Sequence, residues 1–201
     1  MTAINILPES DAIHLFTDTQ VSIEKFGSFA QVSKCTALPH LQAAIATRGR
    51  LDLLAIITEI ACFGCGSPRS LKTSFAWQLK AIIRGSQLAP DKRRALETPF
   101  DIFVVGWLDD APYAYALSNH DLHGPPAWKV QDLPDGYSSP VPNDARLFEK
   151  LRSATDRVRV IPEIVAAQAE VEPTIIGGSI QQTTVSATGI HTKIIGKIPK
   201  A

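Results

Sequence analysis

The sequence predicts a four-layer αββα sandwich of the α/β class, in which two antiparallel sheets face each other and helices cover both outer sides. Two observations favour this architecture. Strand-like segments come in pairs joined by short turns, and their order along the chain is strands, two helices, strands, two helices and strands. A parallel sheet would instead alternate strand and helix strictly. With 201 residues, 45% of them hydrophobic, the chain has the size of one domain, which we expect to span residues 1–201.

The N-terminal segment predicts a β-hairpin. Residues 3–7 and 12–17 are rich in strand-forming apolar side chains, and the polar residues 8–11 between them form the expected turn. With these four residues as the turn, Thr2 faces Thr17, and apolar side chains lie opposite apolar ones across the pair.

The next segments predict a strand pair and then two helices. The strands are expected at residues 29–38 and 41–47, and residues 51–62 form an apolar helical run. A second helix begins with Ser67 as its N-cap and Pro68 at its first position. An apolar stripe at helical spacing follows, which we assign to the core: Leu71, Phe75, Leu79 and Ile82.

The second half of the chain returns to strands. Residues 101–107 and 112–117 predict a hairpin around a turn at 108–111. Residues 118–142 are rich in proline, glycine and histidine and lack periodicity, so we expect an excursion over the surface. Two helices and a last hairpin complete the order, at residues 143–154 and 162–171, and at residues 174–185 and 190–198.

Charge and hydropathy exclude several function classes. Lysine plus arginine (20) equals aspartate plus glutamate (20), so no net field would attract nucleic acid or an anionic membrane. The most apolar run, residues 51–62, is interrupted by Asp52 and Glu59 and is shorter than the roughly 20 residues that a membrane span needs. The first residues include Glu9 and Asp11 and show no secretory signal. We therefore expect a cytoplasmic protein with no nucleic-acid or membrane partner.

Cysteine and histidine patterns give two weaker hypotheses. Cys35, Cys62 and Cys65 cannot all pair with one another, which fits a reducing compartment. The Cys62-to-Cys65 motif lacks the second pair of a zinc site and follows a helical pattern, so ordinary thiols are favoured over a thiol enzyme. His120 and His123 have no third ligand at suitable spacing, which favours surface residues over a metal site.

Thr2 is the first candidate for chemistry because it follows the initiator methionine. Small residues in this position normally permit removal of Met1, which leaves an N-terminal threonine. Such a residue combines a nucleophile with a base, since its hydroxyl attacks a carbonyl while its α-amino group accepts the proton. An α-amino group titrates at about 7.7–8.0, and a nearby ammonium enlarges the free-base fraction at neutral pH.

Asp18 and Lys34 are the carboxylate and the ammonium that this chemistry needs. The hairpin brings Asp18 close to Thr2, and the strand must end or bulge there for the carboxylate to turn inward. Lys34 lies in the otherwise apolar or small-residue run 32–38, where an ammonium needs a partner such as Asp18. In the structural alternative Met1 is retained, Thr2 is an ordinary strand residue, and the other two form an ion pair.

The spacing of these residues resembles that of the proteasome β-subunit and HslV-like peptidase family of N-terminal-nucleophile hydrolases. In that family sixteen residues separate the threonine from the aspartate and the aspartate from the lysine; here 18 minus 2 and 34 minus 18 both equal 16. Residues 46–52 resemble the family segment that ends a strand, offers a backbone N–H to the oxyanion and leads into the first helix. Residues 105–113 resemble the central hairpin and 176–180 the last strands, so the resemblance runs nearly end to end.

The resemblance implies a divergent bacterial-type threonine peptidase or amidohydrolase. Thr2 would attack, Lys34 would tune its amine, and Asp18 would orient Lys34, while the backbone N–H groups of Arg48 and Gly49 would stabilise the oxyanion. No cofactor is required. The resemblance also implies a peptide or protein substrate, a ring-shaped homo-oligomer and an ATP-dependent unfoldase as partner.

Departures from the family favour an alternative, a catalytically inactive assembly or interaction module. Arg48 stands where the family has glycine, so its side chain is expected to fill part of the cleft. Pro173 and Ile176 stand where proteasome β-subunits carry an aspartate and a serine that support the threonine amine. Ser138 or Ser139 is the candidate replacement for the family's other serine.

Overall fold

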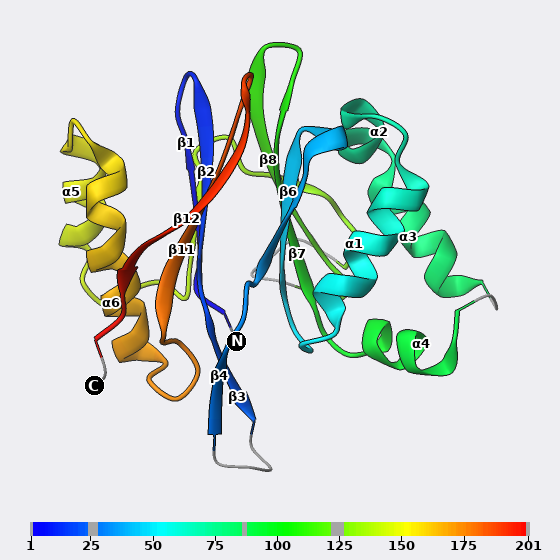
Figure 1. The fold of residues 1–201 in the computed structure, drawn as a ribbon, viewed down its shortest axis with the longest axis horizontal. Helices are drawn as coiled ribbons and strands as arrows, with labels where there is room; N and C mark the ends of the chain where they lie inside the picture. The colour runs from blue at the N-terminus through cyan, green and yellow to red at the C-terminus, as the bar shows by residue number, and fades with distance from the viewer. Residues whose placement is uncertain (1, 24–27, 86–87, 122–126, 200–201) are drawn as a thin grey trace.

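The computed structural model describes residues 2–23, 28–85, 88–121 and 127–199, and in them two five-stranded antiparallel sheets lie face to face between two layers of helices (Figure 1). This confirms the predicted αββα sandwich. The first sheet has the order β10 (Tyr137–Ser139), β1 (Ile4–Pro8), β2 (Ala12–Asp18), β11 (Ser179–Ser186), β12 (Gly189–Lys197). The second has the order β5 (Cys35–Leu38), β6 (Ala43–Arg48), β7 (Asp101–Leu108), β8 (Ala111–Ser118), β9 (Gln131–Asp132).

Each sheet is covered on its outer face by its own helices. The helices over the second sheet are α1 (Leu53–Gly64), α2 (Pro68–Thr73), α3 (Phe75–Arg84) and α4 (Pro90–Glu97). The first sheet is covered by α5 (Arg146–Ser153) and α6 (Ile161–Val171), with a 3-10 helix (Arg157–Val160) between them. A second 3-10 helix (Pro39–Leu41) joins β5 to β6. In the described part of the chain, none of the helices has the length and apolar character that a membrane crossing requires.

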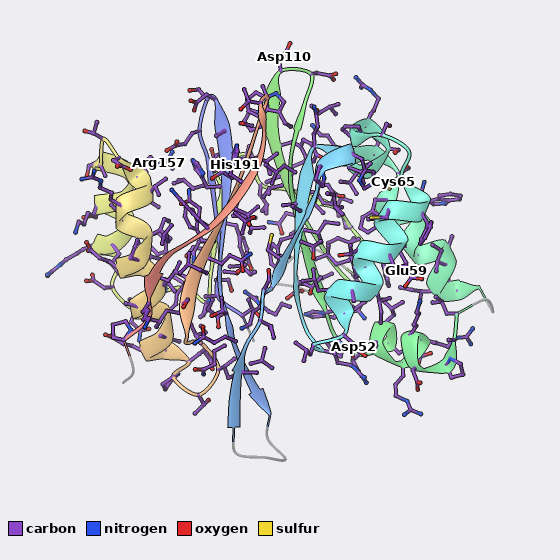
Figure 2. All side chains as sticks on the ribbon, viewed as in Figure 1. Asp52, Glu59, Cys65, Asp110, Arg157 and His191 are labelled. Atoms are coloured by element: carbon purple, nitrogen blue, oxygen red, sulfur yellow. The ribbon has the colours of Figure 1, made fainter. Side chains whose placement is uncertain are left out.

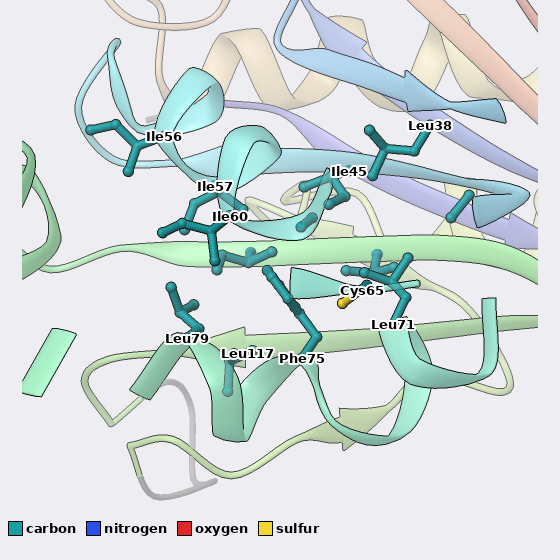
Figure 3. Packing of buried hydrophobic residues seen from close by; sticks show 14 of the residues in the cluster. Leu38, Ile45, Ile56, Ile57, Ile60, Cys65, Leu71, Phe75, Leu79 and Leu117 are labelled. Atoms are coloured by element: carbon teal, nitrogen blue, oxygen red, sulfur yellow. The ribbon is translucent and has the colours of Figure 1, made fainter. Parts of the chain in front are cut away.

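Among the described residues, three apolar cores hold these four layers together. Because side chains alternate along a strand, Ile4 and Ile6 of β1 point into the core between the sheets, while Leu7 packs toward α6. The core between the second sheet and its helices includes Phe75 and Leu79 of α3 (Figure 3). The amphipathic patterns of the strands and helices therefore place each element between defined neighbours.

The first hairpin forms as predicted, but the predicted register differs from the observed one by two residues. Ile4 pairs with Thr17 and Pro8 with Ile13. The Glu9 N–H bonds to the Ala12 carbonyl, so the connection closes one residue later on each strand than expected. A shift of two residues keeps the same side chains on each face, which is why the apolar pattern could not distinguish the two registers.

The predicted strand 29–38 is divided into two. Its first part, β4 (Ser28–Gln31), pairs with β3 (Gln20–Ile23) in a two-stranded ribbon that extends away from the sandwich (Figure 1). Its second part, β5, pairs with β6 as expected. The ribbon was not predicted, and Lys34 lies in the short segment that joins β4 to β5.

The helix that begins at Ser67 also differs from its prediction. Ser67 caps α2 through a capping box with Ser70, as the N-cap assignment predicts, but the helical path breaks at Ser74 and continues as α3. Leu71, on α2, and Phe75, on α3, are nevertheless both buried in one core. Helix α4 was not predicted.

The remaining elements follow the sequence closely. The turn between β7 and β8 is at Asp109 and Asp110, both with positive φ, and the last hairpin pairs β11 with β12. The predicted excursion 118–142 contains the two short strands β9 and β10, which close one edge of each sheet.

Candidate active site

A pocket of about 310 Å³ lies at the end of the sandwich where β1 begins and β6 ends. Figure 2 labels Asp52, next to α1, at this end and Asp110 in the β7–β8 turn at the opposite end. We call this cavity the Thr2 pocket. It is lined by Thr2, Gln20, Val21, Val32, Ser33, Lys34, Thr47, Gly49, Arg50, Leu51, Leu54 and Ile175.

Two of the three residues with the sixteen-residue spacing line this pocket, and the third lies directly behind it. Thr2 is buried just before β1, and Lys34 reaches the pocket from the segment before β5. Asp18, at the last position of β2, is fully buried and accepts a hydrogen bond of 3.0 Å from the N–H of Ala3. The structure thus brings all three residues to one end of the first sheet.

The Asp18 carboxylate is held by several donors at once. One oxygen accepts the Ala3 N–H, while the other accepts the Lys34 ammonium at 2.8 Å and the N–H groups of Gln20 and Gly177 at 3.3 Å. Burial raises the pKa of the Asp18 carboxyl, and Lys34 is the strongest influence against this shift. Because the strand ends at Asp18, the carboxylate can turn toward Lys34, as the sequence predicts.

Lys34 is a nearly buried ammonium with one charged partner among the described residues. Its side chain is 9% exposed, and its Nζ lies 2.8 Å from the Asp18 carboxylate. Burial lowers the pKa of the Lys34 ammonium, and the attraction to Asp18 opposes this shift. The pair therefore fixes a positive charge on the wall of the Thr2 pocket.

Arg48 does not fill the pocket, which corrects the expectation from the sequence. It is not among the lining residues of the Thr2 pocket, because its side chain points into the space between the sheets. One guanidinium nitrogen donates to the Thr2 carbonyl at 3.2 Å and to the Ser139 carbonyl at 3.4 Å. The other lies 3.7 Å from Asp101, the residue opposite Arg48 on β7.

Gly49 has a backbone conformation that requires glycine. Its φ is +141°, and a Cβ atom there would lie 3.1 Å from Leu53 Cδ2 and 3.2 Å from Phe100 Cβ. The chain turns here from β6 toward α1, and Gly49 is one of the residues that line the Thr2 pocket. The role of its backbone N–H as an oxyanion donor stays a prediction.

The two candidate serines on β10 point in different directions. Ser138 donates to the Asn5 side chain and accepts from Gln168 of α6, so it belongs to a buried polar network on the outer face of the first sheet. Ser139 pairs with Ile4 and is buried beside Arg48. The structure therefore leaves Ser139 as the serine on the Thr2 side.

Two contributors to the site were not predicted. Asp101, the partner of Arg48, is a single carboxylate at the start of an apolar strand, and the strand register could have identified it. Gly177 donates its N–H to Asp18, and the Gly177-Gly178 pair in the sequence was the signal that could have identified this residue. A Cβ at Gly177 would lie 2.3 Å from the Gln20 side chain, so glycine permits this close approach.

The thiol and metal hypotheses receive no support from the described residues. Cys35, Cys62 and Cys65 are free, and burial raises the pKa of the Cys65 thiol, which disfavours a nucleophilic thiolate. His123 lies outside the described residues, and His120 lies 3.6 Å from Asp101. Within those residues, no three histidine, cysteine, aspartate or glutamate side chains gather in a way that could hold a metal ion.

Comparison with known proteins gives a result at the level of the fold. No protein family and no curated protein matches the sequence. Among solved structures 425 chains match, and one of them is a Gly-1 mutant of Anbu from Hyphomicrobium sp. strain MC1. The TM-score is 0.66 at 10% sequence identity, and the alignment covers 98% of this chain and 87% of that one. The likeness shows that the chain has a proteasome-like fold.

Proposed function

We propose that this protein is an N-terminal threonine hydrolase of the proteasome-like type, which cleaves peptide or amide bonds after removal of Met1. One observation supports it above all others: the buried Asp18–Lys34 ion pair lies against the N-terminal segment, with Asp18 accepting the Ala3 N–H and Lys34 lining the pocket of Thr2. A buried ion pair is a weak source of stability, so its presence here calls for a functional explanation.

In the proposed mechanism the Thr2 hydroxyl attacks the substrate carbonyl while the Thr2 α-amine accepts its proton. The Lys34 ammonium disfavours a second positive charge nearby and keeps the amine in its basic form. Asp18 holds Lys34 in place. The backbone N–H groups of Arg48 and Gly49 would stabilise the oxyanion, the amine would return its proton to the leaving group, and water would then release the acyl group from Thr2.

The proposal includes partners and location. A proteasome-like fold favours assembly of copies into a homo-oligomer, for which we propose a ring that encloses the pockets. A peptide or protein would be the substrate, an ATP-dependent unfoldase would deliver it, and the cytoplasm would be the compartment. No cofactor takes part in the proposed chemistry.

A second candidate function is an inactive assembly or interaction module with the same fold. It is favoured by Pro173 and Ile176, which provide no carboxylate or hydroxyl at the positions that support the threonine amine in proteasome β-subunits. The two candidates differ in whether the Thr2 amine is free and whether Thr2 is needed for turnover.

The test is N-terminal mass measurement followed by peptidase assays on labelled casein and on short fluorogenic peptide amides. We expect the purified protein to begin at Thr2, and Thr2→Ala to reduce turnover by at least about 1,000-fold. Thr2→Ser should retain part of the activity, because serine supplies the same two groups. Thr188→Ala, in the β11–β12 turn at the opposite end, is the control and should leave turnover unchanged. A working enzyme that retains Met1 would refute the proposal.

A further inference from the structure

We propose that Arg48 is a positioning residue for this site: its guanidinium clamps the Thr2 carbonyl between the two sheets and keeps the adjacent α-amine unprotonated. This inference rests on the proposed function. It assigns to Arg48 a side-chain role separate from that of its backbone N–H.

The clamp joins three segments that meet only at this end of the molecule. Arg48 comes from β6 of the second sheet, whereas the carbonyls that it binds belong to Thr2 and Ser139 of the first. The β1 ladder begins at Ile4, so Thr2 lies outside the regular strand pairing. The guanidinium therefore binds the backbone carbonyl of Thr2, as strand pairing binds the backbone of β1 from Ile4 onward.

Burial makes a purely structural explanation insufficient. The Arg48 side chain is 11% exposed and Asp101 is 4% exposed, and the guanidinium lies over the ring of Phe103, 5.6 Å from its centroid. Arg48 Nε has no hydrogen-bond partner among the described residues. Burying a charge costs more than packing an apolar side chain, and the neighbours of Arg48 on the same face of the second sheet, Ala46 and Phe103, belong to an apolar cluster. A simple link between the sheets would not need a cation here.

The charge is placed to act on the Thr2 amine. The amine and the carbonyl belong to the same residue, so standard backbone dimensions put the guanidinium about 5–6 Å from the amine. A like charge at this distance disfavours protonation. Asp101 offsets the effect only in part, because it lies 3.7 Å from Arg48 and its other oxygen accepts a bond from Ser118.

The other charged groups near the amine are themselves retained when Arg48 or Asp101 is changed. Lys34 pairs with Asp18 and the exposed Arg50 pairs with Asp52. His120 and Glu172 border the cavity on the far side of Arg48, where His120 lies 3.6 Å from Asp101. Removing Arg48 or Asp101 therefore changes the field at the amine in opposite directions.

The experiment measures the pKa of the N-terminal amine directly. The full chain, with Met1 removal verified by mass, is labelled with acetic anhydride across pH 5–9, and modification of the N-terminal peptide is followed by mass spectrometry. We expect Arg48→Met to raise the pKa of the amine by about one unit and Asp101→Asn to lower it by about one unit or less. The acid limb of the kcat/KM profile should move in the same directions. Arg50→Met, which removes an exposed cation, is the control and should cause little shift.

A merely structural role would give no shift, or shifts of the same sign in both variants, and either result overturns the inference. If Arg48→Met does not fold, Asp101→Asn alone decides, because it retains Arg48 and must lower the pKa of the amine. Expected shifts without peptidase turnover in any form would count against the proposed function and leave the clamp standing. A retained Met1 would overturn both.

Discussion

Each end of the sandwich contains a close ion pair, and the two pairs differ in their burial. At the turn end, which carries the β1–β2, β7–β8 and β11–β12 connections (Figure 1), Arg69 and Asp109 form an ion pair at 2.7 Å with both side chains 64% exposed. At the pocket end, Lys34 and Asp18 form a pair at 2.8 Å with side chains 9% and 0% exposed. The two contacts have nearly the same length and differ in their access to water.

This difference separates a contact of small energetic consequence from one that the proposed site would use. Exposed pairs contribute about 0–1 kcal/mol, because water screens the charges and the side chains lose entropy. Buried pairs carry a large desolvation penalty, and removal of one partner leaves the other uncompensated. The buried pair at the pocket end therefore carries a desolvation cost that the exposed pair at the turn end does not carry. A site that uses a fixed charge would show this difference.

The largest effect is expected from Asp18→Asn. This change leaves the Lys34 ammonium buried without its counter-charge, so we expect a loss of about 3–5 kcal/mol in the free energy of unfolding, measured in urea. The double variant Asp18→Asn/Lys34→Met should lose less than the sum of the two single variants, because no unpaired charge remains. Strict additivity would show that the two groups do not interact.

An intermediate effect is expected from Gly49→Ala at the pocket end, compared with Gly189→Ala at the turn end. The two glycines have φ of +141° and +140°, so both changes carry backbone strain of about 1–3 kcal/mol. An added Cβ meets Leu53, Phe100 and Pro99 at Gly49 and nothing within 4 Å at Gly189. Gly49→Ala should therefore cost about 1 kcal/mol more in urea unfolding. Equal losses in the free energy of unfolding would mean that Leu53, Phe100 and Pro99 make room for the added Cβ without measurable cost.

The smallest effect is expected from Asp109→Asn, the same chemical change at the turn end. Asparagine tolerates the positive φ of Asp109, 53°, so only the exposed ion pair to Arg69 is lost. We expect a decrease of about 0–1 kcal/mol that becomes smaller as salt is added. A loss as large as that of Asp18→Asn would contradict the explanation by burial.

Much of the architecture could be predicted from local patterns. The Asp109–Asp110 turn, the Ser67 cap and the order of strands and helices depend on neighbours in sequence, and the structure contains them. The hairpin register could not be fixed, because pairings that differ by two residues present the same faces. The division of the strand after Gln31 depends on pairing with β3, which a single strand pattern does not encode.

The site was predictable to the extent that it depends on spacing. The sixteen-residue intervals brought Thr2, Asp18 and Lys34 together, and the structure has them at one end of the first sheet. The direction of the Arg48 side chain was not predictable, since it depends on which face of β6 meets the other sheet. Its partners are distant in the chain: the Ser139 carbonyl and the Asp101 carboxylate.

The Thr2 pocket draws all of its lining residues except Ile175 from the first 54 positions of the chain. The residues that line this pocket are thus close together in sequence, while the later part of the chain supplies the supporting contacts of Asp101, Ser139 and Gly177. Away from these supporting residues, the later part of the chain is constrained mainly by apolar packing, which tolerates substitutions of similar volume.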